Sequence, residues 1–107
     1  MTIPLDASFR ALADGTRREI LDLLRNGSMT SGQIAGRFAS SWPTISRHLA
    51  VLRDAGLVNA EREGQEVRYE LNASVLEDVI HHLVAWTKRS PRARRTARAP
   101  RAREREA

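Results

Sequence analysis

The sequence predicts a small, mainly α-helical domain that carries one β-hairpin near its C-terminal end. Apolar residues recur at helical spacing through the first half of the chain and again over residues 76–86. Between these stretches, apolar and polar residues alternate over 58–62 and 67–71, on either side of a short loop that contains glycine. A chain of 107 residues has room for one such domain.

Capping motifs and apolar stripes predict the first three helices. The first helix begins near Asp6 and ends at Asp14-Gly15. The second and third helices are expected to begin at Thr16 and Thr30, because each threonine is followed three residues later by Glu or Gln, as in a capping box. Apolar residues at helical spacing support each of the three helices. They are Phe9, Leu12 and Ala13 in the first, a buried stripe of Ile20, Leu21, Leu23 and Leu24 in the second, and Ile34, Ala35 and Phe38 in the third.

A fourth helix is predicted directly after the tight connection Ala39-Ser40-Ser41. Ser41 can cap this helix, and Pro43 suits its first turn, where a missing amide hydrogen costs little. The helix is expected to close at Asp54-Ala55-Gly56. Its apolar face, at positions i, i+4 and i+7, consists of Ile45, Leu49 and Leu52.

The hairpin loop is predicted at Glu63-Gly64-Gln65-Glu66, and a third capping box, which starts at Ser74, is expected to open the last helix. The apolar stripe of that helix is broader than one contact with a small domain requires; it comprises Leu76, Val79, Ile80, Leu83, Val84 and Trp86. About five helices with a two-stranded hairpin follow the plan of a winged helix-turn-helix. The short link between the third and fourth helices is the turn.

The side of the fourth helix opposite its apolar face predicts binding to double-stranded DNA. Short side chains let a helix approach base edges closely, and an arginine can bond guanine through two hydrogen bonds. In this fold the N-terminal turns of the second helix of the motif read the bases. The candidate DNA-contact residues of this helix are Trp42, Pro43, Thr44, Ser46, Arg47, His48 and Arg53.

Several of these residues also have a structural interpretation. His48 borders the apolar face, so it could bind a phosphate or pack between helices. Trp42 could cover the sugar–phosphate backbone or pack against the start of the helix. Thr44 could contact a base or be an ordinary residue of the first turn.

The hairpin adds further candidates that could lie along the DNA backbone or enter the minor groove. They are Arg62, Gln65 and Arg68. The two arginines could instead pair with acidic neighbours, namely Glu61, Glu66 or Glu70.

The net charge of +5 is concentrated at the C-terminal end. Residues 1–87 hold nine arginines and eleven acidic residues, a net −2, whereas residues 88–107 hold nine basic and two acidic residues, a net +7. We expect residues 1–88 to form the DNA-binding domain. Residues 89–107 contain two prolines and no large apolar residue, which predicts a disordered Arg-rich tail. Such a tail could lie on phosphate groups or simply increase solubility.

The composition excludes several other classes of protein. The chain has no cysteine, so disulfides, thiolate nucleophiles, zinc–thiolate sites and iron–sulfur clusters are ruled out. No apolar run approaches the ~18 residues of a membrane-spanning helix, and residues 1–12 lack the layout of a signal peptide. The sequence therefore predicts a cytoplasmic protein without a membrane partner.

Enzymatic activity is not expected. Ser46 and His48 are two residues apart on a helix and point in different directions, so they cannot form a nucleophile–base pair. The chain contains no GxGxxG, P-loop or HExxH motif. The alternative to a domain that reads DNA sequence is a winged-helix module that binds protein and contacts DNA only non-specifically through its basic tail.

Four segments between residues 9 and 72 are distinctive: FRALADGTRREILDLLRNG, MTSGQIAGRF, PTISRHLAVLRDAGLV and REGQEVRYELN. Together they resemble the ArsR family of bacterial winged-helix transcription regulators. The resemblance implies a homodimeric repressor that binds an imperfect inverted repeat in a promoter, with half-sites roughly 34 Å apart. In that family the terminal helices form the dimer interface, which here implies Phe9, Leu12, Leu76, Val79, Ile80, Leu83 and Trp86.

Many members of that family sense metals, through cysteines at the start of the third helix or through Asp and His residues of the last helix. This chain has no cysteine. Its last helix offers Asp78, His81 and His82, but the second, more C-terminal pair of ligands is missing, and the basic residues Lys88 and Arg89 follow instead. We expect no metal site and no cofactor, because basic side chains repel a cation.

Overall fold

The computed structural model describes residues 5–89. Its elements are α1 (Leu5–Leu12), α2 (Gly15–Leu24), β1 (Met29–Thr30), α3 (Ser31–Ala35), α4 (Trp42–Asp54), β2 (Val58–Glu63), β3 (Glu66–Leu71) and α5 (Ala73–Thr87). The five helices and the hairpin confirm the predicted winged helix-turn-helix. Of the expected tail, residues 90–107 lie outside the described residues.

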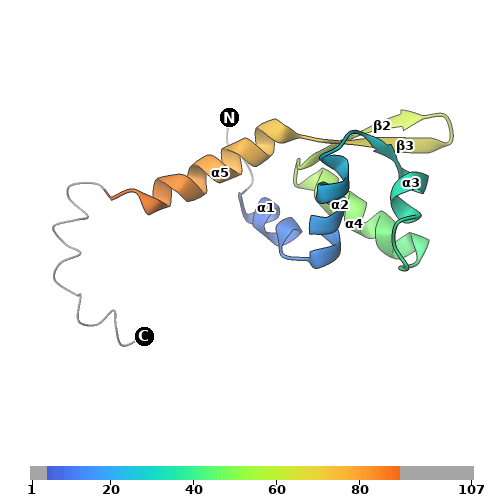
Figure 1. The fold of residues 1–107 in the computed structure, drawn as a ribbon, viewed down its shortest axis with the longest axis horizontal. Coiled ribbons are helices and arrows are strands. Elements are labelled where there is room, and N and C mark those ends of the chain that lie inside the picture. Colours follow the sequence, from blue (N-terminus) through green and yellow to red (C-terminus); the bar gives the residue numbers. More distant parts are fainter. Residues whose placement is uncertain (1–4, 90–107) are drawn as a thin grey trace.

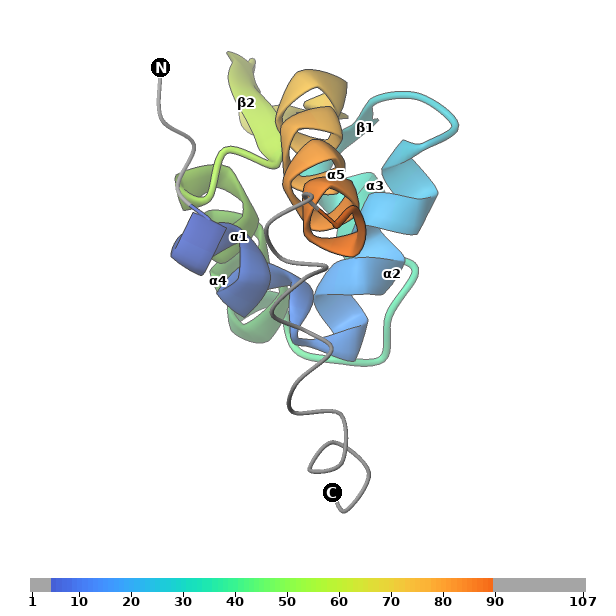
Figure 2. The same ribbon diagram turned by 90° about the vertical axis from the view of Figure 1, so that its left-hand side faces the viewer.

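The elements gather into one body from which two parts extend. Figure 1 shows α1 to α4 packed together, with α5 extending to one side and the β2–β3 hairpin to the other. Viewed along α5, Figure 2 shows α1 and α4 on one side of the body and α2 and α3 on the other. None of the helices within residues 5–89 combines the length and apolarity needed to cross a bilayer.

One hydrophobic core holds the body together. The predicted apolar face of α4 is confirmed, because Ile45, Leu49 and Leu52 are each at most 3% exposed. Burial of each such side chain contributes roughly 1.5–3 kcal/mol to folding, which fixes the rotation of α4 about its axis. The other buried hydrophobic residues of this core are Ala11, Ile20, Leu24, Ile34, Ala55, Leu57, Val58 and Tyr69.

Two of the predicted helix starts are confirmed. The Thr30 hydroxyl accepts the Gln33 amide at 3.2 Å, and the Gln33 side chain accepts the Thr30 amide at 2.9 Å, which completes the capping box. Ser41 caps α4, because its hydroxyl accepts the Thr44 amide at 3.4 Å.

The predicted capping boxes at Thr16 and Ser74 are wrong. Asp14 caps α2, with its carboxylate accepting the Arg17 amide at 3.1 Å, so Thr16 lies inside the first turn. Asn72 caps α5 by accepting the Val75 amide at 3.4 Å. Both caps lie two residues earlier than predicted, because Asp and Asn accept amides at least as well as Thr and Ser.

The sheet has three antiparallel strands in the order β1-β3-β2. The sequence did not predict β1, which pairs Met29 with Tyr69. Glu63 and Glu66 pair with each other, so the hairpin loop consists of Gly64 and Gln65 alone and is shorter than expected. Gly64 has a φ of +65°, a conformation that favours glycine in two-residue hairpin loops.

Candidate nucleic-acid interface

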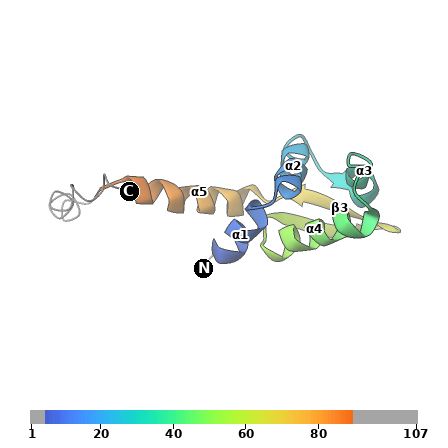
Figure 3. The same cartoon turned by 90° about the horizontal axis from the view of Figure 1, so that it is seen from below.

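The α3–α4 pair forms the predicted helix-turn-helix, and α4 is its second helix. Ser41 and Pro43 fix the start of α4, because Ser41 caps the helix and Pro43 occupies its first turn. Thr44 is half-buried, and its hydroxyl lies 3.0 Å from that of Ser41, so Thr44 is engaged with the cap. In Figure 3, α4 lies along one side of the body, and the hairpin extends on the same side of the domain as the N-terminal end of α4.

The side of α4 opposite the core is open to solvent. Trp42 is 52% exposed, and Pro43, Ser46, Arg47 and Arg53 are exposed as well. Among residues 5–89, Arg47 makes no hydrogen bond or ion pair, so its guanidinium is available to an external acceptor. The structure thus brings these predicted residues together on one surface.

Arg53 is less free than Arg47. Its guanidinium donates to the Asp54 carboxylate at 3.1 Å, and both side chains are well exposed. An exposed pair of this kind contributes at most about 1 kcal/mol. A phosphate can therefore compete with Asp54 for Arg53.

His48 lies against the beginning of α2 and not on the open side of α4. Its side chain is 16% exposed. Nδ1 of the ring is 3.1 Å from Nη1 of Arg17, and Nε2 is 4.0 Å from Oδ1 of Asp14. Of the two roles considered for His48, packing between helices is therefore the one present in the structure.

The predicted DNA-contact residues of the β2–β3 wing differ in whether their side chains are already engaged. Arg68 donates to both carboxylate oxygens of Glu63 at 2.9 Å and to the Ser28 hydroxyl at 3.1 Å. The hydrogen bonds and the positive charge of Arg68 lower the pKa of Glu63 below its ordinary value. Arg62 and Gln65 are exposed, and neither side chain has a hydrogen-bond partner in the part of the chain that the structure describes.

The acidic partner of Arg68 differs from those expected. The sequence suggested Glu61, Glu66 or Glu70, but the pair forms with Glu63. In the register, Arg68 is opposite Glu61, and Glu63 lies two residues further along the same face, within reach of a long side chain. Glu66 is engaged elsewhere, because its carboxylate accepts the Gly32 amide of α3 at 2.9 Å.

A second exposed surface is apolar. Ile80, Leu83, Val84 and Trp86 of α5 are between 42% and 65% exposed, and Phe9 of α1 is 36% exposed. Phe9 and Trp86 contact each other, with ring centroids 6.5 Å apart. Two further residues that the resemblance placed in an interface, Leu12 and Leu76, are half-buried against the core, and Val79 is 2% exposed and packs within the chain.

No cluster of metal-binding side chains is present in residues 5–89. These residues contain no group of three or more His, Asp or Glu side chains that could hold a metal ion. On α5, Nδ1 of His82 is 3.0 Å from the Asp78 carbonyl oxygen, a bond within the helix.

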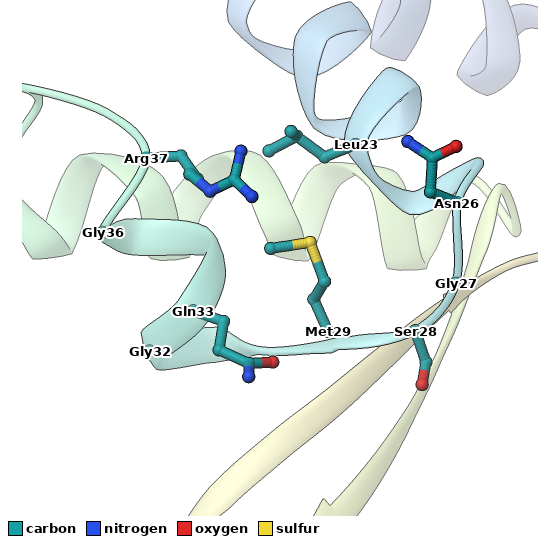
Figure 4. Close-up of a pocket in the computed structure, with 9 residues that line it drawn as sticks. All are labelled: Leu23, Asn26, Gly27, Ser28, Met29, Gly32, Gln33, Gly36 and Arg37. Carbon is teal, nitrogen blue, oxygen red and sulfur yellow. The ribbon is translucent and has the colours of Figure 1, made fainter.

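An open pocket of about 520 Å³ lies between the end of α2 and α3. Figure 4 shows the Arg37 side chain reaching across it toward Leu23, with Met29 in the middle. Its lining has no imidazole or carboxylate, so it offers no acid–base pair; the lining residues are Leu23, Asn26, Gly27, Ser28, Met29, Gly32, Gln33, Gly36 and Arg37.

A helix-turn-helix with an exposed second helix, followed by a hairpin wing, defines the class of winged helix-turn-helix DNA-binding proteins. Residues 14–60 match the family model described as "Bacterial regulatory protein, arsR family". The chain is 47% identical to the transcriptional repressor SdpR of Bacillus subtilis (strain 168), over 71% of this chain and 84% of that protein. The chain belongs to the ArsR family, whose members are DNA-binding transcription regulators and not enzymes.

Solved structures agree with this assignment. The fold is similar to an ArsR-like transcriptional regulator from Rhodococcus sp. RHA1, with a TM-score of 0.71 and 30% identity over 92% of this chain and 91% of that one. It is also similar to a homodimeric winged helix-turn-helix DNA-binding domain from Mycobacterium bovis, with a TM-score of 0.63 and 32% identity over 77% of each chain. The family and fold expected from the resemblance are confirmed.

Proposed function

We propose that this protein is a homodimeric repressor of transcription that binds an inverted-repeat promoter site in the cytoplasm. The observation that carries the proposal is the orientation of α4, which buries its apolar face and exposes hydroxyl and guanidinium groups on the other. The proposed DNA contacts are Trp42, Pro43, Thr44, Ser46, Arg47 and Arg53 of α4, with Arg62 and Gln65 of the wing. Arg68 is left out because Glu63 and Ser28 already engage its guanidinium.

The exposed apolar surface of α5 and Phe9 supports a dimer. Large apolar side chains at 36–65% exposure cost free energy in water, and a second copy of the same surface would bury them. The M. bovis neighbour is itself a homodimer. Two copies related by a twofold axis would present two α4 helices to successive major grooves, roughly 34 Å apart.

The proposal is tested with DNA that the protein itself selects. The full chain would be used to select duplexes from a random-sequence library, and the Kd for a selected and an unrelated duplex would be measured at several salt concentrations. We expect an inverted repeat and a preference of roughly 1,000-fold or more that persists as salt rises. Equal and steeply salt-dependent binding to both duplexes would contradict the proposal and favour the protein-interaction module instead.

Arg47 should contribute sequence preference as well as affinity. Arg47→Ala is expected to reduce the preference for the selected duplex by ~1–3 kcal/mol, because a bidentate contact to a guanine is lost. Arg25→Ala is the matched control. It removes the same charge from an exposed arginine that follows α2 and pairs with Asp22 at 3.4 Å. Equal losses of preference in the two variants would overturn the assignment of Arg47.

A further inference from the structure

We propose that His48 is a positioning residue for α4 and not a DNA contact. Arg17 of α2 holds the His48 ring and thereby fixes α4 against the C-terminal end of α1. The inference rests on the proposed DNA binding by α4, and it concerns how that helix is held in place to read its site.

Arg17 joins three helices through one side chain. Its Nε donates to the Ala11 carbonyl at 2.8 Å, and its Nη2 donates to the Arg10 carbonyl at 3.1 Å. Both carbonyls belong to the last turn of α1, where the backbone carbonyls lack a complete set of amide donors within the helix and can accept from a side chain. The third bond runs from Nη1 to His48 on α4 at 3.1 Å. Because a guanidinium is planar and rigid, these three bonds define one position for the His48 ring relative to α1.

The direction of the third bond specifies the tautomer of His48. A guanidinium only donates hydrogen bonds, so Nδ1 of His48 must accept and the ring proton must lie on Nε2. Nε2 faces Asp14 at 4.0 Å, which is longer than a hydrogen bond but favourable in sign. With its side chain 16% exposed between α2 and α4, the ring has its Nδ1 occupied and its Nε2 turned toward an acid, an unfavourable setting for a phosphate.

The same link connects α4 with the surface proposed for dimerisation. Arg17 caps α1, and α1 carries Phe9, which contacts Trp86 of α5. Hence the two α4 helices of a dimer would be held at a set separation through α1. Loosening the Arg17–His48 bond should weaken binding to the selected duplex, because binding would then also have to order α4.

Two substitutions of His48 separate the positioning role from a DNA contact. In His48→Asn, the amide oxygen takes the place of Nδ1 and can still accept from Arg17. In His48→Gln, the amide takes the place of Nε2 and the Nδ1 acceptor is lost. We expect His48→Asn to bind the selected duplex within about threefold of the unmodified protein and His48→Gln to lose about tenfold. The reverse order would overturn the inference and assign His48 to the DNA interface.

Arg17→Lys provides an independent measurement of the same link. A lysine ammonium cannot reach all three acceptors, so this variant should also lose about tenfold, and the double variant Arg17→Lys/His48→Gln should lose no more than either single variant. Full additivity of the two losses would contradict a shared link. Circular dichroism and melting temperature identify any variant that fails to fold.

The ring of His48 can also be observed without DNA. Nitrogen-15 NMR of the free full-length protein should show the Nε2–H tautomer, whereas an Nδ1–H tautomer would overturn the inference.

The binding measurements distinguish failure of the positioning role from failure of the proposed function. If the unmodified protein prefers no duplex, the proposed function fails. If it does prefer one but His48→Gln binds better than His48→Asn, only the positioning role fails.

Discussion

Four polar side chains set where the helices α2 to α5 begin. Each accepts a hydrogen bond from the backbone amide three positions further along the chain; in order they are Asp14, Thr30, Ser41 and Asn72. Asp14 does more than cap. The hydrogen bond from the Arg17 amide holds the pKa of its carboxyl below the ordinary value, although burial acts in the opposite direction. The same carboxylate therefore caps α2 and lies beside the Arg17–His48 pair that is proposed to position α4.

The lowered pKa of Asp14 predicts an acid-sensitive step in stability. Its contribution is complete above the unfolded pKa of about 3.9 and is lost as the pH falls through the lower folded value. Asp14→Asn keeps a good cap but cannot titrate. Thermal melting from pH 5 down to roughly pH 2.5 should show a smaller loss of Tm in Asp14→Asn than in the unmodified protein. Parallel curves would show that Asp14 is not stabilised in its charged form.

The two missed caps have a common physical cause. Near the starts of α2 and α5 the sequence offers two good capping residues within two positions, Asp14 with Thr16 and Asn72 with Ser74. Local preference barely separates such residues. Asp14 gains contacts with Arg17 and His48. Because His48 lies 31 residues beyond Arg17, a local sequence pattern cannot predict this contact.

The wing is braced at both of its strands. Arg68 links β3 to Glu63 of β2 and to Ser28, just before β1, while Glu66 accepts the Gly32 amide of α3. These contacts hold the hairpin against the helix-turn-helix and leave Arg62 and Gln65 exposed near its tip. Alternation predicted β2 and β3, but β1 has only two residues and shows no period. The partner of Arg68 depends on strand register, which alternation alone does not specify.

The exposed face of α5 makes a separate prediction at the level of one helix. Leu83→Asp should weaken self-association by roughly 100-fold or more, because dimerisation would bury an unpaired carboxylate. It should also weaken binding to the selected duplex, since the two α4 helices would no longer act together. Analytical ultracentrifugation would measure the change.

His81→Asp is the matched control for Leu83→Asp. It introduces the same charge on the same exposed helix, but two residues away, about 200° around the axis. This variant should remain dimeric. If the unmodified protein is monomeric, or if both variants dissociate equally, the apolar face of α5 is not the interface.

For the whole molecule, the distribution of charge must be reconciled with DNA binding. Residues 1–87 carry a net −2, so attraction to phosphate cannot come from their overall charge. On α4 the one acidic residue is Asp54, at the last position and paired with Arg53. Figure 3 shows α5, which carries Glu77 and Asp78, extending away from α4. For DNA binding by this domain, the placement of a few basic groups therefore matters more than its net charge. The net charge of +7 on residues 88–107 is available as a non-specific attraction to phosphate groups.

The fold was largely predictable because each helix carries its own apolar period, and the exposed side of α4 followed from the buried one. The roles of single side chains were less predictable. His48 and Arg68 are of residue types that commonly bind phosphate, yet partners distant in the sequence engage both of them in the structure. Such assignments depend on tertiary contacts that no local pattern specifies.

A backbone NMR titration of the full chain with a duplex that it has selected tests whether α4 and the wing face DNA. We expect the largest amide shifts in residues 42–53 and 62–68, together with changes that saturate at one duplex per dimer. Shifts confined to residues 89–107, with α4 unchanged, would contradict this expectation.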